Sequence, residues 1–273
     1  MRAVTGLLAA VIVGVVASLW SPAPGTAAGK PVILFDEGHG QPFRAGGRGD
    51  LDLSGFAELV RAAGGEVRVA AKALDDRELA GAGALVISGT FAPLGPADIV
   101  AVTHFIARGG RVAVMIHIAP PVEALLRAIG VQHSRAPLRE VDGVIGGRPT
   151  NFTVTRFDRH FLTEGLERIG VFGCYSVRSR VPEARIIAGT GPRAWPDTDG
   201  NGRPSGTEPI GVHGVIVAGQ VGAGEFAVFG DDAIFQNRFL ASHNRALGER
   251  LARWLAGATA GPAAPGRATT IPL

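Results

Sequence analysis

The sequence has 273 residues, with 27 Lys and Arg against 24 Asp and Glu and a single cysteine. One cysteine excludes an intrachain disulfide, and the basic residues form no run of the kind that follows nucleic-acid phosphates, so we expect no nucleic-acid partner. The length suffices for one α/β domain with a large apolar core.

The first 28 residues have the three parts of a secretory signal peptide. Arg2 is the single charge, an apolar stretch follows at residues 7–20, and Thr26, Ala27 and Ala28 form a small-residue cleavage site. We therefore expect export to the bacterial envelope, as a periplasmic or extracellular protein. In the alternative, residues 3–20 remain uncleaved and anchor the chain in the inner membrane, which is the one condition under which we expect membrane contact.

Strands and helices are predicted to alternate along the first half of the chain. An apolar run starts at Val32 and stops in Asp36, Glu37 and His39, which is typical of a strand buried on both faces. The following pattern predicts helices at 50–63, 96–107 and 121–129, and strands at 66–70, 84–88 and 111–117. The alternation indicates βαβ units with right-handed crossovers.

The alternation of strands and helices is interrupted after residue 131 and resumes near residue 212. Short strands are predicted at 151–155, 171–175 and 185–188, then longer strands at 212–221 and 225–230 and a final helix at 237–256. We predict a single α/β domain over residues 29–257, with a three-layer, mostly parallel, flavodoxin-like sheet and helices on both faces. Residues 258–273, rich in Ala, Gly and Pro, are predicted to be a disordered tail.

Several short motifs occur in an order that resembles a known superfamily. They are FDEGHGQ at 35–41, FIARGGR at 105–111, HFLTEG at 160–165, FGDD at 229–232, NRFL at 237–240 and Asn244. In this order they resemble the class I glutamine-amidotransferase-like superfamily, in particular its non-catalytic branch related to gliding-motility auxiliary and intraflagellar-transport domains. The resemblance implies the same α/β fold.

The resemblance also implies that the chain is not a glutaminase. Amidotransferases of this fold place a cysteine nucleophile on a tight turn between a strand and a helix. The corresponding residues 115–120 read MIHIAP and contain neither cysteine nor serine, while Cys174 stands in a predicted strand. The resemblance therefore implies a binding or accessory module, and we expect a protein without catalytic activity rather than an enzyme.

Polar side chains follow several of the predicted parallel strands, whose carboxyl ends share one edge of the sheet. The candidate ligand-binding residues there are Asp36, Glu37, His39, His117, Asp231, Asp232 and Asn237. They could recognise a small polar or glycan-like ligand or an envelope partner protein, and in the alternative His39, His117 and the acids hold the metal of a hydrolase. In a second alternative, Asp36, His39 and Asp231 have a structural role and stabilise the loops. In a third, the chain is a scaffold and residues 131–209 are its contact surface.

A twelve-residue segment at 197–208 matches the calcium loop pattern letter by letter. The candidate calcium ligands are Asp197, Asp199, Asn201 and Glu208, with Gly202 at the turn. The prolines on both sides cannot belong to the helices of an EF-hand, and such residues also occur in ordinary solvated loops. Calcium is thus the one cofactor that the sequence suggests.

Overall fold

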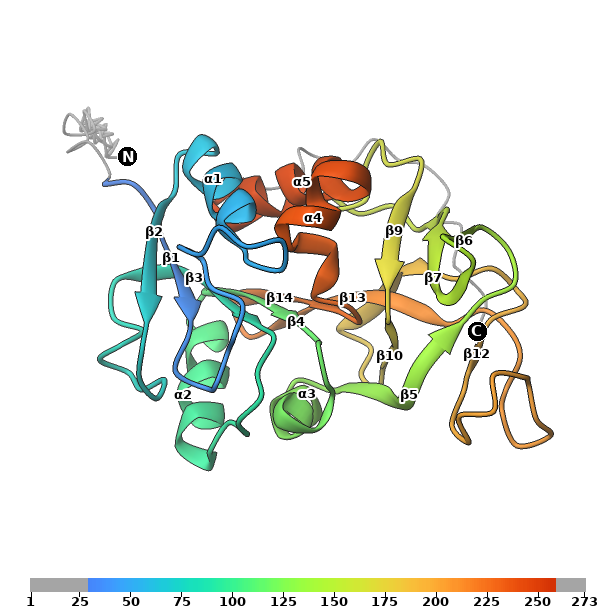
Figure 1. Ribbon diagram of the computed structural model, residues 1–273. Coiled ribbons are helices and arrows are strands. Elements are labelled where there is room, and N and C mark those ends of the chain that lie inside the picture. The colour runs from blue at the N-terminus through green and yellow to red at the C-terminus, as the bar shows by residue number, and fades with distance from the viewer. Residues whose placement is uncertain (1–28, 259–273) are drawn as a thin grey trace, which may run out of the picture.

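The computed structural model describes residues 29–258 (Figure 1). The predicted signal peptide or anchor at 1–28 lies outside the described residues, and so does the predicted tail beyond residue 258. Between residues 29 and 258, no helix combines the length and the hydropathy needed to cross a bilayer.

The helices are α1 (Ser54–Ala62), α2 (Pro96–Ala107), α3 (Glu123–Ala128), α4 (Asn237–Phe239) and α5 (Arg245–Leu255). The strands of the main sheet are β1 (Val32–Asp36), β2 (Glu66–Ala70), β3 (Ala82–Ser88), β4 (Arg111–Met115), β8 (Arg156–Phe157), β11 (Ala184–Gly189), β13 (Gly214–Val221) and β14 (Gly224–Phe229). The remaining strands are β5 (Val131–Arg139), β6 (Val144–Ile145), β7 (Arg148–Val154), β9 (Ile169–Phe172), β10 (Tyr175–Ser179) and β12 (Trp195–Pro196).

The main sheet has eight strands in the order β2-β1-β3-β4-β14-β13-β11-β8. The pairs from β2 to β14 are parallel, and the pairs from β14 to β8 are antiparallel. The prediction of a mostly parallel α/β sheet is therefore confirmed. The register places Ser88 beside Met115 and Met115 beside Phe229, so three strands end at the same level.

The apolar strands are buried because helices cover both faces of the sheet, as Figure 1 shows for α1 and α5 on one face and α2 and α3 on the other. Successive side chains of a strand point to opposite faces. Phe35 accordingly packs in a core with Phe56 of α1 and Leu251 of α5. Its neighbour Leu34 packs in a second core with the helices of the other face.

The middle of the chain forms two small antiparallel sheets, ordered β10-β5-β12 and β6-β7-β9. Hydrogen bonds between residues distant in the sequence hold them to the rest of the domain. The backbone N–H of Tyr175 donates to the carbonyl of Gly230 at 2.7 Å. The side-chain amide of Asn244 bonds to both the N–H and the carbonyl of Gly170, at 2.9 Å each.

The last helix differs from the prediction of one helix at 237–256. It is divided into α4, a π-helical turn at Leu240–Asn244, and α5. The wide turn coincides with the place where the Asn244 side chain bonds to β9 rather than facing solvent. Periodicity alone detects the apolar face of such a helix but not the side chain that interrupts it.

Candidate functional site

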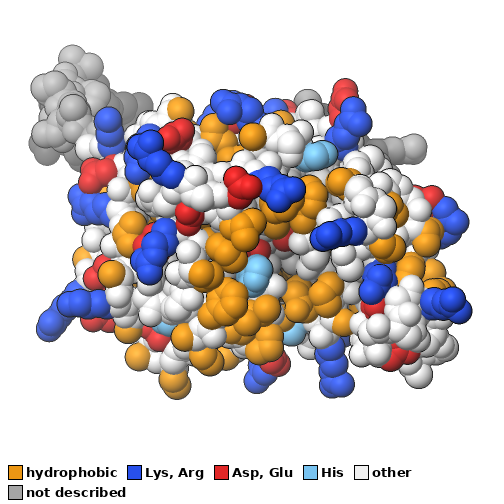
Figure 2. Space-filling model, in the orientation of Figure 1, with side chains coloured by type: hydrophobic (Ala, Val, Ile, Leu, Met, Phe, Trp, Pro, Cys, Tyr) orange, Lys and Arg blue, Asp and Glu red, His pale blue; other side chains and the backbone are white. Residues whose placement is uncertain are grey.

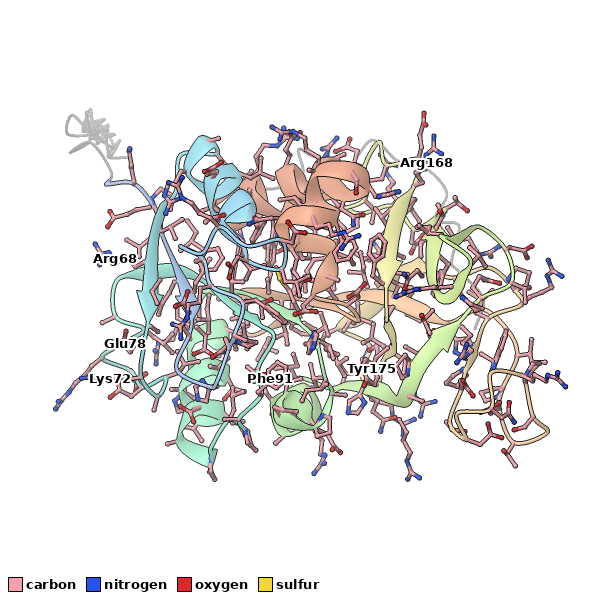
Figure 3. All side chains as sticks on the ribbon, viewed as in Figure 1. Arg68, Lys72, Glu78, Phe91, Arg168 and Tyr175 are labelled. Atoms are coloured by element: carbon pink, nitrogen blue, oxygen red, sulfur yellow. The ribbon has the colours of Figure 1, made fainter. Side chains whose placement is uncertain are left out.

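The loops that follow β1, β3, β4 and β14 meet at the carboxyl edge of the parallel strands. Figure 2 shows hydrophobic side chains gathered around a histidine near the middle of one face of the molecule, and Figure 3 labels Phe91 on that face. The sequence-predicted residues fall into separate groups within these loops. Most of them form hydrogen bonds that connect different parts of the chain. His117, by contrast, is half-buried, and its ring reaches the surface.

His39 lies between two carboxylates and is 6% exposed. Its Nδ1 is 2.9 Å from both carboxylate oxygens of Asp36, and its Nε2 is 3.4 Å from Asp98 Oδ2. The Gln41 amide also donates to Asp36, at 2.6 Å. The hydrogen bond with Asp36 raises the pKa of His39, against the opposing effect of burial.

The same group connects loops that follow three different elements. Asp98, at the start of α2, accepts from the N–H groups of Leu74 and Gly95, at 2.7 Å each. The carbonyl of His39 accepts from the N–H groups of Phe91 and Ala92, at 3.1 and 2.9 Å. Both ring nitrogens of His39 are therefore engaged, and the geometry favours the bracing alternative over ligand contact. We call Asp36, His39, Gln41 and Asp98 the His39 brace.

Glu37 and Asn237 have bracing contacts of the same kind. Glu37 accepts from the Arg44 guanidinium at 3.0 Å and from the N–H of Ala45 at 2.9 Å. Asn237 Oδ1 accepts from the N–H of Gly55, in the first turn of α1, at 2.7 Å, and its Nδ2 donates to the carbonyl of Gly49 at 2.8 Å. Each side chain closes a loop between distant parts of the chain.

His117 follows β4 and has a single polar partner. Its Nδ1 donates to the buried carboxylate of Asp232 at 3.1 Å, which raises the pKa of His117. The ring packs against two phenyl rings, with centroid distances of 5.1 Å to Phe43 and 5.2 Å to Phe91. We call His117, Asp232, Phe43 and Phe91 the His117 site.

Asp231 lies beside this site and is 2% exposed. It accepts from the N–H of Phe172 at 2.5 Å and from the N–H of Ala233 at 2.9 Å, and so links β9 to the end of β14. Burial and the neighbouring Asp232 charge raise the pKa of Asp231 to about 7. Burial also raises the pKa of Asp232, although its hydrogen bond with His117 acts in the opposite direction.

The metal-dependent alternative requires ligand atoms close to one position. Within residues 29–258, one group of three acidic or histidine side chains has ligand atoms within 4.8 Å of one another: Asp197, Asp199 and Glu208. The carboxyl-edge residues His39 and His117 are not part of such a group. The described residues at this edge thus do not bring three such ligand atoms to one position.

The segment at 197–208 brings three of its four candidate calcium ligands together. Gly202, with a φ of +75°, donates its N–H to Asp197 at 3.2 Å. Glu208 accepts from the N–H groups of Thr198 and Ser205, and these bonds lower its pKa. Asn201 instead donates its side-chain amide to Asp199 at 2.8 Å, and Arg139 forms an ion pair with Asp197.

Calcium is expected to raise the melting temperature of chelator-treated protein, because an ion that binds only the folded state stabilises it by about 2.7 kcal/mol at one hundred times its Kd. The expected ligands are the clustered carboxylates of Asp197, Asp199 and Glu208, which have the spacing of a Ca²⁺-binding loop. Asp199→Ala should abolish the rise. Magnesium at the same concentration is the control, and an unchanged melting temperature with calcium would show an ordinary loop.

A family comparison covers most of these residues. The model of a domain of unknown function, DUF4350, matches residues 52–252. The chain belongs to the DUF4350 family. No curated protein matches it.

Solved structures resemble this DUF4350 chain in fold. The N-terminal domain of mmIFT52 is 14% identical with a TM-score of 0.67, and the match covers 84% of this chain and 100% of that one. The cytoplasmic protein STM1381 of Salmonella typhimurium LT2 is 13% identical with a TM-score of 0.51, covering 84% and 100%. A ThuA-like protein of Bacteroides uniformis is 9% identical with a TM-score of 0.50, covering 86% and 95%. These likenesses agree with a glutamine-amidotransferase-like fold.

The cysteine of this DUF4350 chain lies away from the carboxyl-edge loop after β4. Cys174 is fully buried, and its thiol donates to the carbonyl of Tyr175 at 3.1 Å. Burial raises the pKa of the Cys174 thiol well above its ordinary value. A buried thiol that resists ionisation is a small core residue rather than a nucleophile.

Four residues that the structure brings to this edge were not predicted from the sequence as site residues: Gln41, Phe43, Phe91 and Asp98. The sequence could have indicated Asp98, since an acidic residue three positions after Gly95 at the start of a helix is a capping pattern. It indicates Phe43 and Phe91 more weakly, as large apolar residues in polar loops. Their partners lie far apart in the sequence, so no local pattern pairs them.

Proposed function

We propose that this DUF4350 domain is a non-catalytic binding or accessory module of the bacterial envelope that recognises its ligand at the His117 site. The observation that carries the proposal is the half-exposed His117 ring, held at Nδ1 by the buried Asp232 and flanked by Phe43 and Phe91. This arrangement leaves Nε2 to bond with a ligand, because the bond at Nδ1 fixes the ring orientation. The ligand is a small polar molecule, or in the alternative a side chain of a partner protein.

Two further features of the chain support a binding role. The buried Cys174 and the engaged nitrogens of His39 supply neither a reactive thiol nor a free imidazole ligand. The His39 brace also holds the Phe91 loop through the carbonyl of His39, so one wall of the site is pre-organised. Pre-organised groups lose less conformational entropy when a ligand binds.

We also propose a three-layer flavodoxin-like architecture and membership of the branch related to gliding-motility and intraflagellar-transport domains. The first proposal is supported by the two apolar cores on opposite faces of the sheet. The second is supported by the likeness to the mmIFT52 N-terminal domain, which covers the whole of that domain. Export to the envelope is proposed from the sequence of residues 1–28.

The proposal is tested by screening polar fragments against the isotope-labelled full chain while the ring ¹H and ¹⁵N resonances of its histidines are observed. Sugars, amino acids, carboxylates and nucleosides form the panel. We expect at least one class to move the His117 resonances, because a ligand at Nε2 changes the ring's hydrogen bonding.

His104 supplies the matched control for this screen. It is exposed in the last turn of α2, and α2 runs away from the carboxyl edge, where Asp98 lies in its first turn. Fragments that move the His117 resonances should leave those of His104 unaffected, and Phe43→Ala should weaken fragment binding about tenfold, in line with the energy of an aromatic contact. If every fragment that binds moves His104 or other resonances instead, the His117 site is not the recognition site.

A further inference from the structure

The His117 site presents an exposed aromatic surface. Phe91 is 46% exposed although it is a large apolar side chain, and its ring lies 6.4 Å from that of Phe43. The two phenyl rings come from loops after neighbouring strands β1 and β3, and His117 contacts both. Figure 3 shows Phe91 on the same face as Tyr175 of β10. Such a surface can receive the apolar face of a ligand.

The residues around the Asp232 carboxylate are tightly packed. A Cβ on Gly89 would lie 2.9 Å from the Phe43 ring and 3.0 Å from the Asp232 carboxylate, and Gly89 has a φ of +60°. The backbone after β3 therefore occupies the space between the ring and the acid. Asp232 in turn bonds to His117 at 3.1 Å and lies 3.4 Å from the Gln236 amide. Asp232 and Gln236 are buried, so His117, which Asp232 holds, is the polar group that adjoins the aromatic surface.

The charges of the site compensate one another. His117 is paired with Asp232, and burial keeps Asp231 partly protonated near neutral pH. Arg44, in the loop after β1 that also carries Phe43, is paired with Glu37 rather than with this site. An anionic ligand would lie close to the two buried carboxyl groups of Asp231 and Asp232, and a cationic ligand would contact the His117 ring when that ring is protonated. The site therefore matches a ligand without net charge.

We infer that the His117 site binds a neutral pyranose residue of a glycan, whose apolar face packs on Phe91 while one of its hydroxyl groups bonds to His117 Nε2. A pyranose ring combines an apolar face of C–H groups with hydroxyls along its rim, and this combination matches an exposed phenyl ring beside a half-exposed imidazole. The inference rests on the proposed function and specifies its ligand.

The test is titration of the full labelled chain with neutral disaccharides, namely cellobiose, maltose, lactose, mannobiose and chitobiose. Glucuronic acid, galacturonic acid and the dipeptide alanyl-alanine are titrated in parallel, and His117 ring resonances report binding. We expect one or more neutral disaccharides to move these resonances, with the uronic acids at least tenfold weaker. The free disaccharide and a polysaccharide built from it are then compared to identify the natural source.

Two variants separate ring stacking from other causes. Phe91→Ala should weaken the bound disaccharide about five- to tenfold, as expected for one aromatic contact. Val100→Ala, which removes an apolar side chain that is 52% exposed on α2, should leave the affinity unchanged. Because both side chains are largely exposed, both variants should retain the melting temperature of the parent within about 2 °C.

The possible failures are distinct. Movement of His117 by the uronic acids or the dipeptide, with none by the neutral sugars, overturns the glycan inference and leaves the proposed function intact. Equal affinity of Phe91→Ala and the parent for a neutral sugar also overturns it. A panel in which no probe moves His117 overturns the inference, and the wider fragment screen then decides the proposed function.

Discussion

His39→Ala is expected to lower the free energy of unfolding by about 3 to 5 kcal/mol, as is usual when one partner of a buried charge pair is removed. The variant would leave the buried carboxylates of Asp36 and Asp98 without the imidazole that lies between them. An unpaired buried charge costs far more than the pair contributes when intact.

The pH dependence of this loss has a definite sign. The pKa of His39 is raised in the folded state, so its stabilising charge is fully present below the unfolded value of 6.5 and is lost as the pH rises through the folded value. Chemical denaturation of the parent and of His39→Ala should therefore show a wider gap at pH 6 than at pH 8.

His117→Gln is the matched control for His39→Ala. It also removes an imidazole beside an aspartate, but the His117 side chain is 35% exposed and has one polar partner. We expect this variant to lose about 1 kcal/mol or less, as is usual for a partly exposed group. If His39→Ala lowered the free energy of unfolding no more than His117→Gln, His39 would have no bracing role, and it would again be a candidate for ligand recognition.

The second large effect is expected from Asp231→Asn, which should remove a pH-dependent penalty from the folded state. Burial raises the pKa of Asp231 from 3.8 to about 7, so between these values the folded protein keeps a proton that the unfolded chain has released. A raised carboxyl pKa means that stability is lost as the pH rises through this window. The parent should therefore lose about 2 to 3 kcal/mol relative to Asp231→Asn between pH 5 and pH 8.

The measurement is the free energy of unfolding of both proteins at several pH values, and the slope is compared rather than the absolute value. The asparagine carbonyl can accept from only one of the N–H groups of Phe172 and Ala233 in the way Asp231 does, which adds a constant cost. Asp76→Asn is the control, because it removes a carboxylate that is 66% exposed. Parallel curves for the parent and Asp231→Asn would mean that Asp231 stays ionised in the fold.

The parallel part of the fold was predictable because its signals are local. The runs at β3 and β4 are apolar on both faces, and α2 begins at Pro96 and is followed by Gly109 and Gly110. The predicted bounds for α2 are those of the structure. The strand β5 was not predicted, because its mixture of polar and apolar residues has no strict period and its pairing partners come from β10 and β12.

The candidate site was predictable in position but not in its pairings. The rule that strand ends share an edge places Asp36, His117 and Asp231 in neighbouring loops. It cannot tell that His39 meets Asp98, which belongs to a helix beyond two further strands, or that His117 meets Asp232. These pairings depend on the register of the sheet and the course of the loops, and they decide which histidine lies between two carboxylates and which one is paired with a single aspartate.

The separation of the His39 brace from the His117 site has a consequence for how such a domain can change. The brace fixes the Phe91 loop through the main chain, because the His39 carbonyl accepts from the N–H groups of Phe91 and Ala92 whatever side chains those positions carry. Position 91, whose side chain is largely exposed, can therefore vary while the loop retains its path. A library randomised at this position, with Asp36, His39 and Asp98 kept, would vary the exposed surface of the site on a frame whose stability is set elsewhere.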